Sequence, residues 1–464
     1  MIRSDLLAAI ALLAMWRLAT PASVAVESSP SRQAALPLAP ITIVSSAPRL
    51  VLAHYILCCS FAKPHLTPGD ARKEMLLAQS NGIDGFALNL GAWTREPAYK
   101  ANLSTMFEAA AQVKDFVLLP SFDAAGGLRP EESAEALSIA SRFPNQLRID
   151  GRPVVSTFDT SREWLRAFRS SARQRGLDPV IWPNMLLVDA ADRDHGSELE
   201  APSLPRAQKI CNAVADFDGF FLFGAAQATQ KITTSVASLA KCLGAAGKTF
   251  VSPVAGYYRG LGANPRVYEG DGMTRMQAMW TSAIENKSRI VELVTWNDWG
   301  EATYLRPLED AASRIMYRAS WPLVLNHRGY LAASKYFIHW FKTGSPPVLA
   351  GNRAFVFYQP ETAADRQKDI SKFVNGDRPD KNRKIYIHFQ TTDQIAITFR
   401  HGAQVETKTV DPGLSNISFE ALDAGGVLEF IDRSTDARGE LQLRAGPEFA
   451  NARLDYETDV VEIQ

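Results

Sequence analysis

The segment 293–308 reads L-V-T-W-N-D-W-G-E-A-T-Y-L-R-P-L and has the clearest chemical signal in the chain. Two carboxylates three residues apart, Asp298 and Glu301, follow an apolar β-type run and lie among the indoles of Trp296 and Trp299. Indoles stack on the C–H faces of pyranose rings and exclude water, which raises the pKa of one carboxyl above that of the other. This asymmetry suits acid/base cleavage of a glycosidic bond. The alternative is an edge loop with solvated carboxylates and tryptophans that fill the core.

The elements that must position this segment alternate regularly along the chain. Near-continuous apolar strands separated by amphipathic helices predict a parallel sheet covered on both faces. The predicted strands are 50–57, 85–90, 116–122, 153–158, 180–188, 219–223, 249–254 and 290–296. The predicted helices are 70–81, 103–113, 130–143, 163–175, 233–246 and 273–285.

Eight such units in about 250 residues predict an α/β fold, a (β/α)8 TIM barrel over residues 49–347. A doubly wound open sheet is the competing topology. That fold usually carries a phosphate-binding glycine loop after its first strand, and His54-Tyr55-Ile56 is no such loop. In a barrel the active site lies at the carboxyl ends of the strands.

Polar side chains occur at most of these predicted strand ends. They are His54 with Tyr55, Asn89, Ser121 with Asp123, Thr157 with Asp159, Asn184 with Asp189, Tyr257 with Tyr258, and Asn297 with Asp298 and Glu301. Singly, each has a structural explanation: Asp123 and Asp159 as helix N-caps, and His54 as a buried histidine with satisfied hydrogen bonds. Together they converge on one face, which these explanations do not predict.

Four tryptophans are candidate sugar platforms, namely Trp93, Trp182, Trp280 and Trp299. Trp280 lies in a helical pattern, where core packing is the simpler explanation. Asp271 follows the seventh predicted strand, and it could contact substrate or cap the helix that starts at Met273.

The C-terminal third has a different pattern. An amphipathic helix is predicted over 330–342, followed by a linker or loop over 348–383. Residues 384–464 contain short alternating strands and turns without helical signal, which predicts an antiparallel β-sandwich accessory domain. A carbohydrate-binding module and a structural cap fit this domain equally well.

The N-terminus has the form of a secretory signal, with Arg3, an apolar stretch over 6–16 and small residues up to Ala25. We therefore expect a signal peptide over 1–25, a flexible leader over 26–48, and a secreted or periplasmic protein. An uncleaved anchor is the alternative.

Four cysteines fit export. Cys211 and Cys242 could form a disulfide, whereas a bond between the adjacent Cys58 and Cys59 would be strained, and free buried cysteines fit equally well. The scattered histidines and cysteines have no metal-site spacing, so we expect neither a metal ion nor a cofactor.

The chain has 464 residues, of which 50 are basic and 50 acidic. A formal net charge of zero gives no electrostatic case for a nucleic acid or an anionic membrane as partner. We expect no nucleic-acid partner and no stable membrane insertion after signal cleavage. Composition does not specify an oligomeric state.

The chain resembles glycoside hydrolase family 71, the α-1,3-glucanases or mutanases, as a divergent member of bacterial type. The resemblance spans about residues 49–347. It rests on V-L-A-H-Y at 51–55, G-I-D-G-F-A-L-N at 82–89, S-F-D at 121–123, G-R-P-V-V-S-T-F at 151–158, F-D-G at 217–219, V-S-P-V at 251–254, G-D at 270–271, T-W-N-D-W-G-E at 295–301 and K-T-G-S-P-P at 342–347.

The resemblance implies a (β/α)8 barrel with a β-sandwich, and hydrolysis of α-1,3-glucan with inversion. It places the catalytic carboxylates on Asp298 and Glu301, and we hypothesise that Glu301 is the general acid and Asp298 the general base. Inversion would separate the two carboxyl groups by roughly 6.5–9.5 Å. The candidate substrate-binding residues are His54, Tyr55, Asn89, Trp93, Asp123, Asp159, Tyr257, Asp271, Trp296, Asn297 and Trp299.

The chain departs from the family pattern in segment 220–224, which lacks the expected tryptophans. Two alternatives therefore accompany the α-1,3-glucanase hypothesis. One is a glycosidase with the same chemistry on another polysaccharide. The other is a glycan-binding protein that uses the barrel cleft without hydrolysis.

Overall fold

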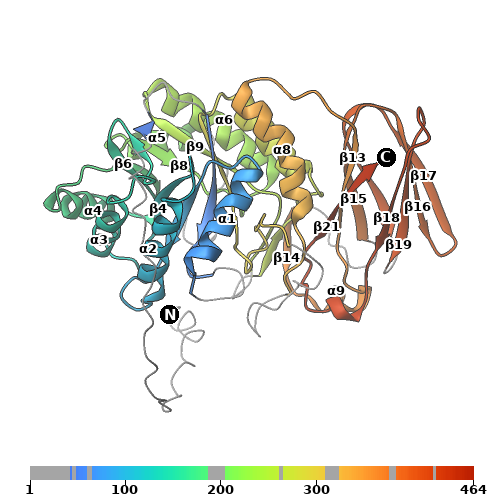
Figure 1. Ribbon diagram of the computed structural model, residues 1–464, viewed down its shortest axis with the longest axis horizontal. Coiled ribbons are helices and arrows are strands. Elements are labelled where there is room, and N and C mark those ends of the chain that lie inside the picture. The colour runs from blue at the N-terminus through green and yellow to red at the C-terminus, as the bar shows by residue number, and fades with distance from the viewer. Residues whose placement is uncertain are drawn as a thin grey trace, which may run out of the picture. The chain divides into compact units, whose positions relative to one another are not determined.

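The computed structural model describes residues 42–43, 49–59, 65–185, 204–260, 265–308, 323–375, 383–421 and 425–464 (Figure 1). The expected signal peptide, most of the expected leader and Asp189 lie outside the described residues. The short strand β1 (Thr42–Ile43) falls within the expected leader. It pairs with β5 (Arg148–Ile149).

Eight parallel strands form the main sheet. They are β2 (Leu50–Ile56), β3 (Gly85–Leu90), β4 (Val117–Asp123), β6 (Arg152–Thr160), β7 (Val180–Met185), β8 (Gly219–Phe221), β9 (Thr249–Val254) and β12 (Ile290–Leu293). Hydrogen bonding joins them in the order β7-β6-β4-β3-β2-β12-β9-β8. The last strand thus lies beside the first, and the sheet curls (Figure 1).

The two ends of this order, β7 and β8, share no ladder within the described residues. Side chains join them instead: the Asn184 amide donates to the carbonyl of Phe221 at 3.2 Å, and the N–H of Ile181 donates to a carboxylate oxygen of Asp218 at 3.0 Å. The structure therefore establishes a curled parallel α/β sheet, whereas the fully closed TIM barrel stays a prediction.

Register aligns the carboxyl ends of neighbouring strands. Ile56 lies opposite Asn89, Asn89 opposite Ser121, and Ser121 opposite Ser156. Strands such as β3 are buried along their whole length, which is why they read as continuous apolar runs. The polar residues at their ends are therefore gathered at one edge of the sheet.

Eight longer helices accompany these strands among the described residues. They are α1 (Pro68–Ser80), α2 (Ala98–Ala110), α3 (Pro130–Ala140), α4 (Arg162–Gln174), α5 (Leu204–Ala213), α6 (Thr229–Ala245), α7 (Thr274–Glu285) and α8 (Arg328–Thr343). Ser161 caps α4 by accepting from the N–H of Trp164, so Asp159 is not the N-cap. None of the helices in the described part of the chain is long and apolar enough to cross a membrane.

Two antiparallel four-stranded sheets form the C-terminal part, as the alternating pattern predicts. One has the order β18 (Gly413–Ala421), β15 (Arg383–Thr391), β13 (Asn352–Tyr358) and β21 (Glu457–Ile463). The other has the order β17 (Gln404–Val410), β16 (Ile395–His401), β19 (Gly426–Asp432) and β20 (Arg438–Leu443). Buried residues of both sheets, among them Phe389 and Phe430, share one apolar core.

The structure corrects the expectation of a linker or loop over 348–383. This stretch contains β13, the short helix α9 (Ala363–Lys368) and β14 (Lys372–Asn375). Strand β13 is buried on both faces: Val356 packs in the sandwich core, while Phe355 and Phe357 belong to the core of the α/β part. A strand between two cores lacks the alternation of apolar and polar residues that marks a half-exposed strand, and for this reason the sequence does not predict β13.

Three shorter elements complete the described part of the chain. Strand β14 pairs with β11 (Arg266–Tyr268), which pairs with β10 (Tyr258–Gly260). The 3-10 helix η3 (Pro447–Phe449) begins a segment, residues 447–456, that leads into β21. These elements matter because β10 and this segment contact the loop that carries Asp298 and Glu301.

Candidate active site

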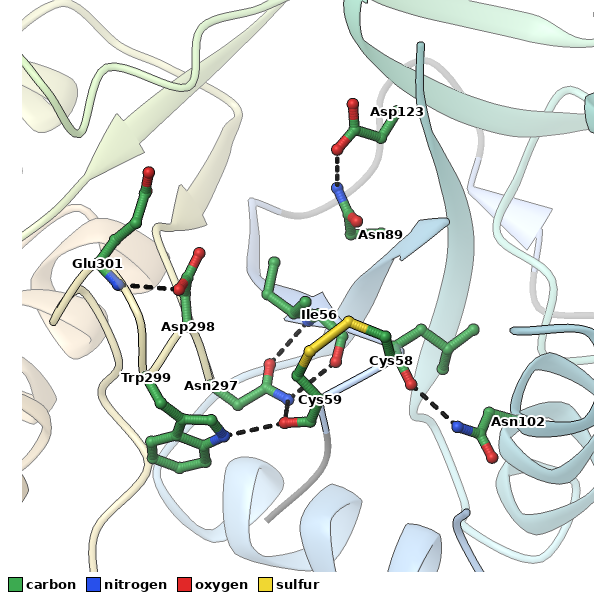
Figure 2. Close-up of a disulfide and its surroundings, with 11 residues drawn as sticks. Ile56, Cys58, Cys59, Asn89, Asn102, Asp123, Asn297, Asp298, Trp299 and Glu301 are labelled. Carbon is green, nitrogen blue, oxygen red and sulfur yellow. Dashed lines mark hydrogen bonds between the residues drawn. A yellow bond between two sulfur atoms is a disulfide. The ribbon is translucent and has the colours of Figure 1, made fainter. Parts of the chain in front are cut away.

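The loop after β12 holds both candidate catalytic carboxylates. The N–H of Trp296 donates to the carbonyl of His54 at 2.7 Å, which joins the start of the loop to the end of β2. The Thr295 hydroxyl accepts from the N–H of Asp298 at 2.9 Å. Asp298 in turn accepts from the N–H of Glu301 at 3.0 Å. Because of this turn, both carboxyl groups point to the same side of the loop (Figure 2).

The surroundings of Glu301 favour the protonated form of its carboxyl group. Its carboxyl group is recessed in the protein, and this burial, together with the negative charge of Asp298, raises its pKa to about 8. The hydroxyl of Tyr258 in β10 donates to it at 3.0 Å and, with Arg266, limits the rise. With a pKa near 8, Glu301 keeps its proton at neutral pH, as a general acid must.

Asp298 lies in a different environment although it is a near neighbour. Burial raises its pKa, but backbone N–H donors from Glu301 and Gly300 hold the pKa down, as does the charge of His54. Donors aimed at a carboxylate favour its charged form. The pair can therefore hold one proton on Glu301 and leave Asp298 ionised, the division of roles that acid/base cleavage needs.

A second pair of carboxylates lies across from the first. Asp123 accepts from the Asn89 amide at 3.5 Å and from the N–H of Gly126 at 2.9 Å. Burial raises the pKa of Asp123, and the charge of Asp123 raises the pKa of both Asp159 and Glu301. Figure 2 shows Asn89 and Asp123 facing the side of the loop from which Asp298 and Glu301 project. These four carboxylates form one electrostatic cluster.

His54 lies beneath this cluster with a partner that the sequence did not reveal. Its Nδ1 lies 2.7 Å from an oxygen of Glu292 in β12, and both side chains are almost completely buried. Phe221 stacks on the imidazole and Phe223 meets it edge-on, at ring distances of 5.9 and 5.3 Å. A glutamate inside the apolar run of β12 was the available signal, because a buried carboxylate needs a partner.

The tryptophans that the sequence suggests as sugar platforms are all buried in this structure. Trp93, Trp296 and Trp299 are 4%, 0% and 2% exposed. Their indole N–H groups donate to Glu135, to Glu74 and to the Cys59 carbonyl. Trp182 and Trp280 are also buried. Trp93, Trp296 and Trp299, which are buried and have their indole N–H groups bonded, therefore pack as core side chains in this structure.

Two tyrosines are likewise absent from the carboxylate cluster. Tyr55 follows His54 in β2 and points to the opposite face, where its ring lies 5.1 Å from that of Phe86. The hydroxyl of Tyr257 donates to the carbonyl of Leu454 at 2.7 Å. Both tyrosines are buried and lie outside the carboxylate cluster, so substrate binding by them stays a prediction.

The remaining polar candidates are held by protein groups. Asp271 is exposed and accepts from the hydroxyl of Tyr386 at 2.9 Å, away from the cluster. Asn297 is fully buried, and its amide bonds the backbone of Ile56 and Cys59. Among the sequence-based candidates, the structure thus brings together His54, Asn89, Asp123, Asp159, Asp298 and Glu301.

Residues 452–454 support the loop from behind. Arg259 in β10 is fully buried, and its guanidinium donates to the carbonyls of Ala452 and Arg453 at 2.6 and 2.7 Å. Its backbone N–H donates to the carbonyl of Glu301 at 2.9 Å. The C-terminal part is therefore integrated with the site rather than tethered to it. The sequence could not predict this contact, because Arg259 and residues 452–453 lie far apart along the chain and meet only in the folded protein.

All four cysteines are paired, as Cys58–Cys59 and Cys211–Cys242. The alternative of free buried cysteines is therefore wrong. Within the described ranges, no three His, Cys, Asp or Glu side chains are arranged to hold a metal ion.

A cavity of about 680 Å³ lies at the other end of the strands, lined by Leu50, Val180, Thr249 and Ile290 among others. These residues begin their strands, whereas the carboxylates lie where strands end. In parallel α/β sheets of this kind the chemistry occurs at the carboxyl ends, so the cluster and not this cavity is the candidate site.

The chain is similar in sequence to a known family and to known enzymes. The model of glycosyl hydrolase family 71 matches residues 47–437. The chain is 25% identical to the glucan endo-1,3-alpha-glucosidase agn1 of Schizosaccharomyces pombe over 402 residues, covering 81% of this chain and 85% of the relative. It is 25% identical to a mutanase of Penicillium rubens over 63% of this chain and 62% of the relative. Among solved structures, an endo-alpha-mannosidase of family GH99 from Bacteroides thetaiotaomicron aligns with a TM-score of 0.45 and 14% identity, covering 64% of this chain and 98% of that chain.

Proposed function

Since the chain belongs to glycosyl hydrolase family 71 and is therefore a glycoside hydrolase, we propose that it hydrolyses α-1,3-linked glucan, with Asp298 and Glu301 as its acid/base pair. The names of two relatives support the substrate: one is a glucan endo-1,3-alpha-glucosidase and the other a mutanase. The observation that carries the assignment of residues is the unequal environment of two neighbouring carboxyl groups.

Glu301 acts as the general acid in this mechanism. It is protonated at neutral pH because burial and the charge of Asp298 raise its pKa to about 8. It donates that proton to the glycosidic oxygen as the bond to C1 breaks. Asp298 is the general base and takes a proton from the water that attacks C1 from the opposite face. Tyr258 keeps the Glu301 carboxyl oriented through its 3.0 Å hydrogen bond.

Inversion at C1 follows from this division of roles. A water molecule between base and sugar requires the carboxyl groups to stand roughly 6.5–9.5 Å apart when substrate is bound. Asn89, Asp123 and Asp159 form the facing wall and would bind sugar hydroxyls, for which carboxylate and amide groups are suited.

Two broader features belong to the proposal. We propose that the protein is exported, which two disulfides and the signal-like N-terminus support. We also propose that the eight parallel strands close into a (β/α)8 barrel. The ladder between β12 and β2, and the side-chain bonds of Asn184 and Asp218 near β7 and β8, support closure.

A second candidate substrate is another polysaccharide cleaved by the same chemistry. The observation in its favour is the burial of Trp93, Trp296 and Trp299, which leaves the cleft without these indoles as platforms. Such platforms contribute to recognition of a particular glucan rather than to bond cleavage.

Release of reducing ends from a panel of α-1,3-, α-1,4-, β-1,3- and β-1,4-glucans tests the function. We expect activity on α-1,3-glucan, lowered by at least about 10²-fold in both Asp298→Asn and Glu301→Gln. Activity confined to another glucan would overturn the substrate, and full activity in both variants would overturn the site. Proton NMR of the first product anomer tests inversion.

A further inference from the structure

The disulfide between the adjacent residues Cys58 and Cys59 lies at the carboxyl end of β2, next to the carboxylate loop (Figure 2). Cys58 is partly exposed, and Cys59 is buried. The other disulfide, Cys211–Cys242, joins α5 to α6. Only the first lies beside groups proposed to act on substrate.

The backbone around this disulfide binds both residues that flank Asp298. The Cys59 carbonyl accepts from the indole of Trp299 at 2.9 Å and from the Asn297 amide at 3.2 Å. The Asn297 amide also accepts from the N–H of Ile56 at 2.7 Å and donates to its carbonyl at 3.0 Å. Residues 56–59 thus fix both sides of Asp298 by side-chain bonds.

A bond between adjacent cysteines closes a small ring that contains their peptide group. The ring restricts ψ of Cys58 and φ of Cys59, and φ of Cys59 fixes where the carbonyl carbon of Cys59 lies relative to that peptide. In the dithiol these torsions are free. Two buried donors, on Asn297 and Trp299, depend on this carbonyl, and buried donors that lose an acceptor drive a rearrangement of the groups that carry them.

We propose that the Cys58–Cys59 disulfide is a positioning element for Asp298 and Glu301, so that glucan hydrolysis depends on the oxidation state of this pair. The inference rests on the proposed function. A dithiol reductant converts the pair by exchange: its thiolate attacks one sulfur, the S–S bond breaks, and Cys58 and Cys59 become thiols while the reductant becomes a disulfide. The partial exposure of Cys58 gives the reductant access.

A background variant, Cys211→Ser with Cys242→Ser, isolates the effect because it removes the other disulfide. In this background, full-length protein is compared before and after dithiothreitol, with thiols counted by mass spectrometry. We expect kcat on α-1,3-glucan to fall by roughly 10- to 100-fold on reduction, as misplaced catalytic groups do, with KM nearly unchanged. Reoxidation should restore kcat. Adding Cys58→Ser with Cys59→Ser should mimic the reduced form and remove the response to reductant.

Hydrogen exchange of the same samples gives a readout that needs no substrate. Reduction should speed exchange in peptides covering 295–303 and leave β9 unchanged. If the oxidised enzyme cleaves no α-1,3-glucan, the proposed function fails, while the exchange experiment still decides the role of the disulfide. Unchanged kcat and unchanged exchange after verified reduction would overturn the inference. Faster exchange throughout the molecule would also overturn it, because the bond would then serve general stability.

Discussion

Replacing Glu301 by glutamine removes a carboxyl group that the fold keeps protonated. Its pKa rises from the ordinary value of 4.5 to about 8 because of burial and the charge of Asp298. The folded protein therefore holds this proton more tightly than the unfolded chain. Its contribution to stability is full below about pH 4.5 and is lost as pH rises to about 8.

The magnitude follows from the difference between these two pKa values. At about 1.36 kcal/mol per pKa unit, it corresponds to at most ~5 kcal/mol. Glu301 keeps some exposure and shares its proton equilibrium with Asp298, so we expect about half of this, ~2–3 kcal/mol. Glutamine cannot ionise, so the variant should lack this loss and gain stability relative to the parent as pH rises.

Urea denaturation at pH 5 and pH 9 measures the effect. The difference in unfolding free energy, parent minus Glu301→Gln, should become more negative by ~2–3 kcal/mol between the two pH values. Glu96→Gln at an exposed glutamate is the matched control and should show no such change. In Asp298→Asn the loss should end at a lower pH and be smaller, because the charge that raises the folded-state pKa of Glu301 is gone. Parallel pH dependence of the parent and Glu301→Gln would refute the account of this site.

Three further substitutions test neighbouring contacts. Tyr258→Phe removes the donor that limits the pKa of Glu301, so the alkaline limb of the kcat/KM–pH profile should move to higher pH. The value of kcat/KM should fall by at most about ten-fold. A shift of the alkaline limb to lower pH would contradict this. Glu292→Gln removes the charged partner of buried His54 and should lower the unfolding free energy in urea by ~1–3 kcal/mol, and an unchanged midpoint would count against the pairing. Glu74→Ala leaves a buried guanidinium and an indole N–H without this acceptor and should cost ~3–5 kcal/mol by the same assay, whereas a loss below ~1 kcal/mol would show that the contact is dispensable.

The strands of the α/β part could be predicted from the sequence because both of their faces are buried. The predicted bounds 85–90 and 249–254 are those of β3 and β9. Asp298 and Glu301 could be placed at a strand end for the same reason. Strand β13 could not be predicted, since its burial comes from two cores that only the folded chain brings to it.

The surroundings of the carboxylates were less accessible to sequence reasoning. A polar or aromatic residue at a strand end can face the cleft or the helices, and a shift of one residue decides between them. Tyr55 and Trp296 face the core for this reason, although His54 beside Tyr55 lies under the site. Contacts such as Tyr258 with Glu301 depend on a strand, β10, that has three residues and no clear pattern.

Hydrolysis of an α-1,3-linked oligoglucosyl fluoride tests the central claim, the roles of Glu301 and Asp298, most directly. Fluoride leaves without protonation, so this substrate needs a base for water but no general acid. Glu301→Gln should therefore cleave the fluoride at a rate near that of the parent while it loses at least about 10²-fold on α-1,3-glucan, and Asp298→Asn should lose activity on both. The assignment would be contradicted if both variants lost activity on the fluoride equally. It would also be contradicted if Asp298→Asn, and not Glu301→Gln, cleaved the fluoride at a rate near that of the parent.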